Sequence, residues 1–439
     1  MSLDYLHLIN DKIKTFCRGK NIENYSVTIS QSDGLSVSIR EQEADVIEHN
    51  NDNALIICIY RGQKKGIATT TNLSQSSIEL AIEKARYIAK WTQDDKYAGL
   101  PDSEDFATKF IDLDTYYDDK INVDKMINAA CITEKAGLDV AGISCAESVD
   151  IDSSFSTTML SNSLGFTGYA RSSHYGLSAT MIAAKNGDKQ RDGEYSIHRK
   201  FKSLDDAKTI GIKASKKTLS RLNPVKIKTG KYPIVLDAQV AKGLFGTFIS
   251  AISGSNLYNK NSFLLDSLDK KIFSKQINIQ QKPFVRGLWG SVNFDNEGVA
   301  PQNTQIIKNG VLQSYLLSSY SARRLGLKTT GNAGGVHNLF IEHNNKLPQK
   351  QLLKNMDKGL FITETIGMGV NLLTGDYSKG ATGFWVENGK ICYPISEFTI
   401  ADNLNNIYNN IIAVGNDIDY RGNILTGSIF IKEMMIAGT

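Results

Sequence analysis

The pattern of hydrophobic and polar positions divides the chain into three stretches of different texture. Residues 25–72 alternate between apolar and polar side chains, with turn residues at Asp33-Gly34, at 50–53 and at Gly62. A period of two with turns between the runs is typical of antiparallel strands joined in a meander. The first stretch therefore predicts a sheet.

A helix is predicted immediately after this sheet. Ser76 and Glu79 have the spacing of a capping box, and the apolar positions that follow recur at helical intervals. The polar segment around Gly99 and Pro101 then has the composition of a linker. We place an N-terminal α+β module at residues 1–100.

The second stretch has the order helix, sheet, helix. Residues 122–136 carry a helical apolar stripe, and residues 143–200 alternate again over several long strands. Ser203 with Asp206 marks the start of another helix. This order predicts a strand-rich middle module at residues 115–223.

Short strands and glycine turns dominate the third stretch. The Asn309-Gly310 and Asn388-Gly389 steps between apolar runs are hairpin signals, and residues 292–299 are expected to form a further short strand. Residues 238–254 are compatible with a helix, and one helix is expected near 403–411. A β-dominated C-terminal domain is predicted over residues 230–439, so the fold class is α+β with several domains.

Composition adds mainly exclusions. The 439 residues carry 50 basic and 46 acidic side chains, so the net charge of +4 does not point to nucleic acid. No window has the roughly 18 apolar residues of a membrane span, and the first residues lack the apolar core of a signal peptide. The five separated cysteines contain no CxxC pair and suggest no disulfide framework. We expect a cytoplasmic protein that binds neither nucleic acid nor membrane.

The segment "GNAGGVHNLFIEHNN", residues 331–345, raises the question of a metal site because it groups His337, Glu342 and His343. Its apolar positions favour a strand, in which six residues separate the two imidazoles by about 20 Å. Zinc requires ligand atoms about 2 Å away, so the two histidines cannot share one ion. HExxH, GxSxG and Walker motifs are absent from the sequence. No catalytic residue and no metal ligand is predicted in this chain.

Three glycine-rich loops with polar tips, at residues 294–304, 329–338 and 371–385, are the remaining candidates for a site. Tight turns are the ordinary reason for such loops, but three of them in one domain can also line a concave site for a peptide backbone. The candidate substrate-binding residues are Gly334, Gly335, His337, Asn338, Thr374, Gly375, Asp376 and Tyr377. Arg323 is a further candidate, either as an anchor for a carboxylate or as half of an ordinary surface pair with Arg324.

Several segments resemble the TldE (PmbA) branch of the TldD/TldE metallopeptidase family, and the resemblance runs through most of the chain. They are "KWTQDDKYAGLPD", "SYSARRLGLKTTGNAGGVHNL", "GMGVNLLTGDYSKGATGFWVENGKICYPISEFTIADNL" and "IIAVGND". The resemblance implies a heterodimer in which a TldD-like subunit carries zinc on an HExxxH helix and a downstream cysteine. It also implies that a TldE-like subunit closes a chamber over that zinc, where small or unfolded peptides such as antitoxins and modified peptide precursors are cleaved.

This chain departs from the catalytic pattern at both zinc-binding positions. Residues 238–265 contain no His, Asp, Glu or Cys, and residues 425–428 (Leu-Thr-Gly-Ser) stand where the cysteine would fall. The resemblance therefore implies no cofactor in this chain and zinc in a TldD-like partner. Two alternatives remain open: a self-sufficient hydrolase with a site built from His337 and Asp376, and a homodimeric peptide-binding or regulatory adaptor.

Overall fold

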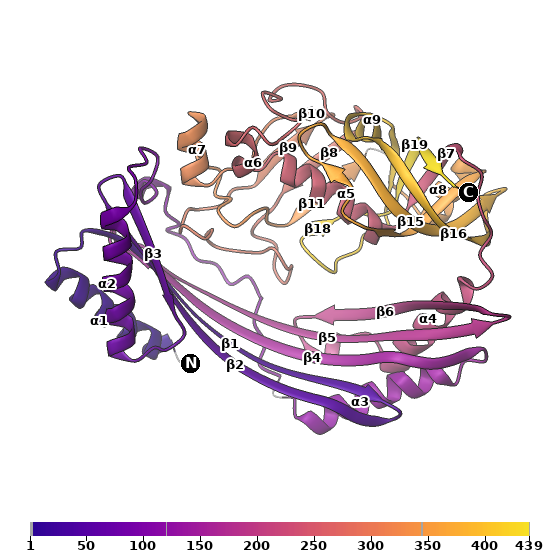
Figure 1. Cartoon of the computed structure of the whole chain (residues 1–439), viewed down its shortest axis with the longest axis horizontal. Coiled ribbons are helices and arrows are strands. Elements are labelled where there is room, and N and C mark those ends of the chain that lie inside the picture. The colour runs from indigo at the N-terminus through magenta and orange to yellow at the C-terminus, as the bar shows by residue number, and fades with distance from the viewer. Residues whose placement is uncertain (1–2, 120, 344–345, 439) are drawn as a thin grey trace.

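A long curved sheet and a C-terminal half that lies over one of its faces make up the computed structural model, which describes residues 3–119, 121–343 and 346–438 (Figure 1). The sheet has six strands in the order β3-β2-β1-β4-β5-β6, and all neighbours are antiparallel. Its strands are β1 (Asn24–Arg40), β2 (Glu43–Arg61), β3 (Lys64–Thr70), β4 (Ile143–Asn162), β5 (Thr167–Lys185) and β6 (Asp188–His198). Residues 344–345, at the end of the histidine-containing segment, lie outside the described residues.

The sheet combines strands from the first and the second stretch of the sequence. β1 pairs with β4 from Ser26 opposite Asn162 to Ile39 opposite Val149. The strands predicted for two modules therefore form one continuous sheet, and the long segment between them crosses from one end of the sheet to the other (Figure 1).

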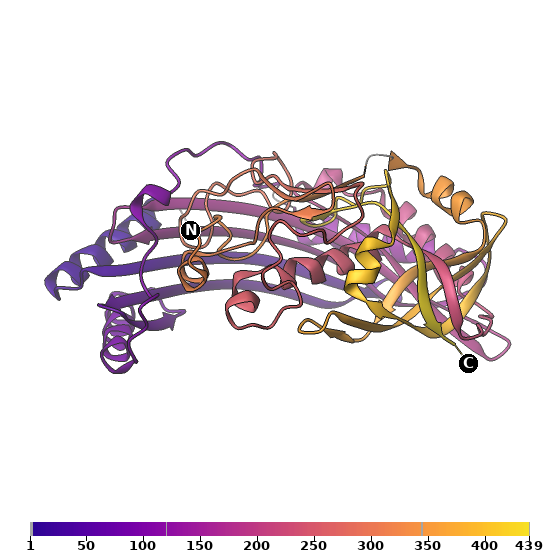
Figure 2. The ribbon, with the colours of Figure 1, turned by 90° about the horizontal axis from the view of Figure 1, so that it is seen from above.

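Helices cover one face of the sheet and leave the other polar. α1 (Leu3–Gly19) and α2 (Gln75–Trp91) pack at one end, and α3 (Val123–Leu138) and α4 (Ala207–Ser220) pack at the other (Figures 1 and 2). Because side chains alternate along a strand, the positions between the buried apolar residues point to the opposite face. The side chains there are largely hydroxylic: Ser30, Ser32, Ser36 and Ser38 of β1, Ser154, Ser156 and Thr158 of β4, and Ser172, Ser178 and Thr180 of β5. We call this the hydroxyl face, and it is the face turned toward the C-terminal half.

The predicted helix starts were wrong at two positions. Ser74 is the N-cap of α2 and its side chain accepts a hydrogen bond from the backbone of Ser77, whereas the predicted cap, Ser76, lies inside the helix. Asp206 caps α4, and Ser203 belongs to a preceding 3-10 turn. Several neighbouring residues can each accept the same backbone hydrogen bond, so the residue type alone does not choose among them.

Five strands of the C-terminal half close into a ring. β7 (Gly230–Leu236), β13 (Gly359–Ile366), β15 (Asp376–Glu387), β16 (Lys390–Asn403) and β19 (Ile429–Ala437) pair in that order, and β19 pairs back onto β7. The shorter strands β12 (Lys346–Leu347), β14 (Val370–Asn371) and β17 (Ile411–Gly415) extend it. A separate sheet has the order β10-β9-β8-β11-β18, with β8 (Ile277–Gln281), β9 (Thr304–Lys308), β10 (Val311–Leu312), β11 (Leu339–His343) and β18 (Ile424–Leu425).

The helix predicted near 403–411 is α9 (Leu404–Asn409), and the segment 238–254, compatible with a helix, contains α5 (Ala238–Ala251). The C-terminal half also contains helices that were not predicted: α6 (Gly254–Tyr258), α7 (Ser319–Leu325) and α8 (Gln349–Met356). The strand predicted at residues 292–299 is wrong, because that segment forms turns. Among the described residues, no helix is long and apolar enough to cross a membrane.

Aromatic packing around α5 forms the centre of the C-terminal core. Phe248 and Phe273 lie with their ring centroids 4.9 Å apart, and Phe273 stacks on Tyr408 at 4.5 Å. Phe245, Phe248 and Tyr408 are fully buried. Aromatic pairs at such distances add about 0.5–1.5 kcal/mol each to the effect of burial. α5 therefore uses its inward side chains for packing.

Guanidinium groups join the sheet to the C-terminal half. Among the arginine contacts between the C-terminal half and the preceding part of the chain are Arg199 with the carbonyls of Leu288 and Trp289, Arg221 with Glu364 and Thr382, Arg323 with the linker carbonyls of Tyr97, Gly99 and Leu100, and Arg421 with Glu194 and the carbonyl of Tyr195. The Arg421 contact includes further charged groups. Asp419 accepts a hydrogen bond from Arg421, and its carboxylate lies 2.9 Å from the Lys242 amine. Burial disfavours the charged form of Asp419, but its hydrogen bonds from Arg421 and Lys242 outweigh burial and lower its pKa.

Replacing Arg421 should loosen this boundary. Arg421→Gln leaves Glu194 and Asp419, both largely buried, with fewer partners, and we expect a loss of about 2–4 kcal/mol, seen as a lower urea midpoint. The matched control is Arg191→Gln, which removes an exposed pair with Glu147 and should cost at most about 1 kcal/mol. Equal midpoints for the two variants would contradict the assigned role of Arg421.

Candidate functional site

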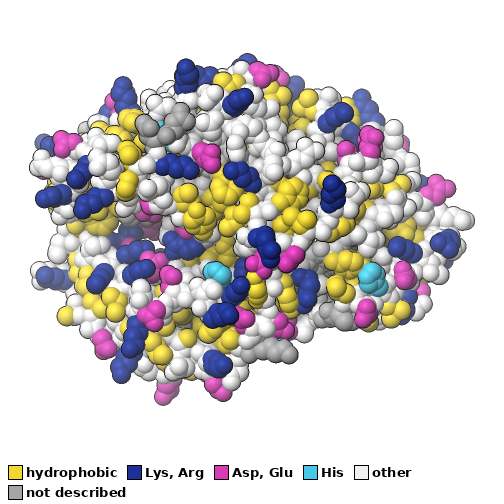
Figure 3. All heavy atoms as spheres, turned by 180° about the vertical axis from the view of Figure 1, so that it is seen from behind, with side chains coloured by type: hydrophobic (Ala, Val, Ile, Leu, Met, Phe, Trp, Pro, Cys, Tyr) yellow, Lys and Arg dark blue, Asp and Glu magenta, His cyan; other side chains and the backbone are white. Residues whose placement is uncertain are grey.

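A cleft lies where the C-terminal half meets the hydroxyl face. It has a volume of about 660 Å³ and is lined by β4 and β5, by residues 111–116 and by residues 289–294. Its floor includes Ser156 and Ser172, whose hydroxyl oxygens lie 2.7 Å apart. Ligand pockets commonly have volumes of about 300–1,000 Å³, so the cleft is large enough for a short peptide segment. Seen from behind, the surface also has a hollow between the two halves toward the left of the view, with basic and acidic side chains around it (Figure 3).

Cationic and aromatic side chains form the walls of this cleft. The Arg199 guanidinium lies 4.3 Å from the centre of the Trp289 ring, and the Arg171 guanidinium lies 3.5 Å from the centre of the Tyr116 ring. Burial lowers the pKa of Arg199 to about 10, because the charged form loses water without gaining a carboxylate. His174 is placed against Trp289, and its Nε2 lies 3.1 Å from the Asp152 carboxylate.

Two of the predicted site residues, His337 and Asn338, lie behind the cleft wall and are buried. The Asn338 side chain accepts from the Gly290 backbone at 2.9 Å and donates to the Lys282 carbonyl at 3.0 Å and to the Ser291 hydroxyl at 2.8 Å. The His337 ring bonds through Nε2 to the Gly331 carbonyl at 2.8 Å, and burial lowers its pKa. Both side chains are therefore used inside the chain: Asn338 fixes the residues next to Trp289, and His337 fixes the glycine loop at Gly331.

Two of the three glycine loops meet next to this wall. The Asp295 carboxylate accepts hydrogen bonds from the backbones of Glu297, Val299 and Ala333, so it ties residues 294–304 to residues 329–338. Gly334 and Gly335 have φ angles of +101° and +115°, which favour glycine, and both are exposed. These loops form one unit that supports the cleft from behind.

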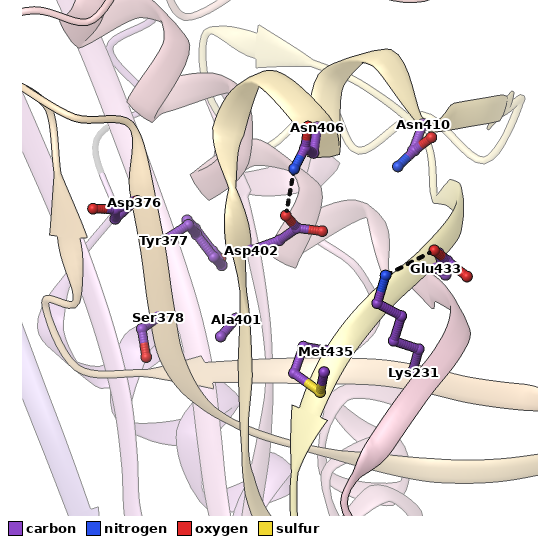
Figure 4. A pocket seen from close by; sticks show the side chains of 10 residues that line it. All are labelled: Lys231, Asp376, Tyr377, Ser378, Ala401, Asp402, Asn406, Asn410, Glu433 and Met435. Atoms are coloured by element: carbon purple, nitrogen blue, oxygen red, sulfur yellow. Dashed lines mark hydrogen bonds and ion pairs between the residues drawn. The ribbon is translucent and has the colours of Figure 1, made fainter.

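The third glycine loop belongs to a different pocket. Asp376 and Tyr377 line a hollow of about 600 Å³ on the outside of the strand ring, together with Lys231, Asp402 and Glu433 (Figure 4). Within the described residues, no member of the other two loops borders it. The structure therefore does not bring the predicted residues together in one site.

The polar groups of this third loop serve mainly its own turn. Thr374 donates to Asp376 at 2.7 Å, and this bond, with a second from Asn403, lowers the pKa of Asp376. Gly375 turns the chain with a φ of +80°. Tyr377 is buried, and burial raises its pKa to about 12.

Arg323 contacts the linker rather than an open pocket centre. It donates to the carbonyls of Tyr97, Gly99 and Leu100 and lies 3.7 Å from Asp102. The guanidinium that was a candidate anchor for a carboxylate is therefore already bonded to groups of this chain.

The cleft residues escaped prediction because no motif marks them. Arg199 directly follows β6 in "YSIHRK", and Trp289 lies in "RGLWGS", where neither spacing nor periodicity signals a site. Buried Gln281, which accepts from Asn332 and from the His337 backbone, belongs to the same support. Only "GGVHN", whose polar residues interrupt an apolar run, carried a local signal.

The residues near α5 do not fit a zinc site. Asp237 caps α5, and Gln349 lies between Asp237 and Asp417 while donating to Ser428 at 2.9 Å. Burial, followed by the nearby Asp417, raises the pKa of Asp237 despite the hydrogen bond from Gln239. Over the described ranges, no three His, Cys, Asp or Glu side chains are grouped as metal ligands.

Removing the Asn338 carboxamide should weaken the cleft wall. Asn338→Ala leaves Gly290, Lys282 and Ser291 without their partner, so we expect a loss of about 2–3 kcal/mol and a changed Trp289 fluorescence. The control Asn51→Ala, at an exposed position on β2, should stay within about 0.5 kcal/mol of wild type. An unchanged unfolding midpoint for Asn338→Ala would show that the wall does not depend on it.

The two joined loops should respond to pH through Asp295. Burial raises its pKa from 3.8 to about 7, so the folded state binds the proton more tightly than the unfolded chain. This contribution to stability is present below pH 3.8 and is lost as the pH rises through 7. The stability of wild type relative to Asp295→Asn should therefore decline over this window. Exposed Asp45→Asn is the control, and a parallel profile for wild type and Asp295→Asn would refute the assignment.

Comparison with known proteins places this geometry in a family. Three domain models match, the PmbA/TldA metallopeptidase domain 1 over residues 25–89, the central domain over 111–222 and the C-terminal domain over 229–438. The metalloprotease PmbA of Escherichia coli O157:H7 is 43% identical over 94% of this chain and 92% of its own length.

Solved structures show the same fold. A crystal structure from Bacteroides thetaiotaomicron, described as a candidate modulator of DNA gyrase, matches with a TM-score of 0.94 and 26% identity over 100% of both chains. TldE from Thermococcus kodakarensis matches with a TM-score of 0.86 and 20% identity over 97% of this chain and 100% of its own. The domain models and the identity to PmbA together show that this chain belongs to the PmbA/TldD family of metallopeptidases.

Proposed function

We propose that this chain is the TldE-like, non-catalytic subunit of a heterodimeric zinc metallopeptidase in the cytoplasm. The observation that carries the proposal is the composition of residues 238–265, which contain no His, Asp, Glu or Cys. A catalytic zinc site uses about three protein ligands, usually from these residue types. In this proposal a TldD-like partner supplies the zinc, and its bound water attacks the peptide.

The packing of α5 supports this assignment. A catalytic helix at this place would direct ligands toward substrate, whereas α5 buries Leu244, Phe245 and Phe248 in the aromatic core. The segment after β18 is likewise engaged in packing, since Thr426 and Ser428 are fully buried and Ser428 donates to Asp417. Both positions are thus filled by structural contacts.

The hydroxyl face supports a role in holding substrate. Serine and threonine hydroxyls both donate and accept hydrogen bonds, so such a surface can bind an extended peptide backbone whatever its sequence. The substrates we propose are small or unfolded peptides, including antitoxins and modified peptide precursors. The cleft would then be this subunit's share of a common chamber.

The self-sufficient hydrolase built from His337 and Asp376 finds no support in the geometry. The His337 ring is buried and bonded to the Gly331 carbonyl, while Asp376 lies at the pocket on the strand ring. A homodimeric adaptor remains the second candidate, and the same experiment separates it from the heterodimer.

Mixing the purified chain with a TldD-like homologue from the same genome tests the proposal. We expect a one-to-one complex by light scattering, zinc bound by the homologue by elemental analysis, and peptide cleavage only in the mixture. A homologue with its HExxxH glutamate replaced by glutamine is the matched control and should form the complex without cleavage. Zinc-dependent cleavage by this chain alone would overturn the proposal, and absence of a complex would favour the adaptor.

A further inference from the structure

Arg199 is a charged residue of the cleft that is almost completely buried and has no carboxylate partner within the ranges that the structure describes. Its side chain lines the cleft, yet the residue is only 6% exposed. Its terminal nitrogens donate to the carbonyls of Ser173, Leu288 and Trp289, and its Nε has no hydrogen-bond partner among the described residues. Neutral carbonyls satisfy part of its hydrogen bonding but do not balance its charge. A buried cation of this kind is costly unless an anion completes its surroundings.

The acidic side chains around the cleft already have other partners. Asp112 and Asp114 lie 3.2 and 3.9 Å from Arg286, and Asp152 pairs with His174. Arg171, also on the cleft, is exposed and stacks on Tyr116, and no ion pair to it is found in the described part of the chain. The charge balance of the cleft therefore favours a bound anion.

The other surfaces of the cleft suit a peptide. Trp289 and Phe294 offer apolar area, and the hydroxyls of Ser156 and Ser172 offer donors and acceptors for a backbone. Guanidinium groups bind carboxylates with charge-assisted hydrogen bonds of well-defined geometry. Free carboxylates occur at the end of a peptide and on aspartate and glutamate.

We propose that this cleft binds a carboxylate of the peptide substrate, with Arg199 at the inner end and Arg171 at the mouth. The cleft would thereby select peptides by a free chain terminus or by an acidic side chain. That the ligand is a peptide rests on the proposed function, whereas the anion preference rests on the residues of the cleft alone.

The test measures binding to the isolated full-length chain through its tryptophan fluorescence, since Trp289 is one of only three tryptophans. Three short acetylated Gly-Val peptides are compared: a free acid, its C-terminal amide, and an amide with one internal aspartate. We expect the free acid or the aspartate peptide to bind at least about tenfold more tightly than the plain amide. The aspartate peptide distinguishes a side-chain carboxylate from a chain terminus. Trp289→Phe should abolish the signal.

Substitutions assign the preference to the cleft. Arg199→Gln and Arg171→Gln should each reduce the preference for the carboxylate peptide, whereas Arg191→Gln, an exposed arginine paired with Glu147, should keep it. If circular dichroism shows that Arg199→Gln does not fold, Arg171→Gln and Arg199→Lys provide the test. The lysine variant should keep part of the preference for the carboxylate peptide.

Equal binding of all three peptides, or a preference that survives both Arg171→Gln and Arg199→Gln, would overturn the carboxylate site. Neither result would bear on whether a TldD-like partner forms a complex with this chain. Conversely, the absence of such a complex would leave the measured preference intact.

Discussion

Directional hydrogen bonds from arginine side chains, together with one buried aromatic cluster in which Phe166 packs against Phe294, fix how the C-terminal half lies on the long sheet. Outside that cluster the face that the sheet presents is largely hydroxylic, so it offers less apolar surface to remove from water than the face covered by helices. A guanidinium carries five N–H groups and stays charged at any ordinary pH, which lets it bind carbonyls and carboxylates in a set geometry. Arg199, Arg221, Arg323 and Arg421 each do this from different elements. The cleft exists because the two halves are joined at such points while the surfaces between them stay open.

The same principle explains the glycine loops. In the two loops at residues 294–304 and 329–338, buried polar side chains bind the backbone of neighbouring loops, as Asp295 does for Ala333 and Asn338 does for Gly290. Gly334, with a φ of +101°, lets the two loops approach closely, because a Cβ there would overlap the Asn296 side chain. The segment that first suggested a metal site therefore works as a support for the wall that carries Trp289.

The sequence predicted individual strands and hairpins but not how they associate. Alternation predicted the long strands of residues 143–200, and Asn309-Gly310 and Asn388-Gly389 predicted hairpins that the structure contains, because those signals lie within a few residues. The pairing of β1 with β4 depends on surfaces more than a hundred positions apart, which no local period encodes. At the site, the sequence shows that polar residues interrupt the apolar run in "GGVHN", but it does not show that the side chains of His337 and Asn338 point into the protein. Arg199 and Trp289 can be identified as cleft residues only in the folded chain, where the guanidinium lies against the indole ring.

The ring of the C-terminal half also sets an order of events for the newly made protein. β7, at residues 230–236, completes its pairing only with β19, at residues 429–437, which is synthesised about two hundred residues later. The long sheet, in contrast, has all its strands by residue 198. Domains fold as units during synthesis, the N-terminal ones first. The sheet can therefore be complete while the ring still lacks β19. A chain synthesised only as far as residue 428 would leave the edges of β7 and β16 exposed, and unpaired strand edges of this kind lead to aggregation.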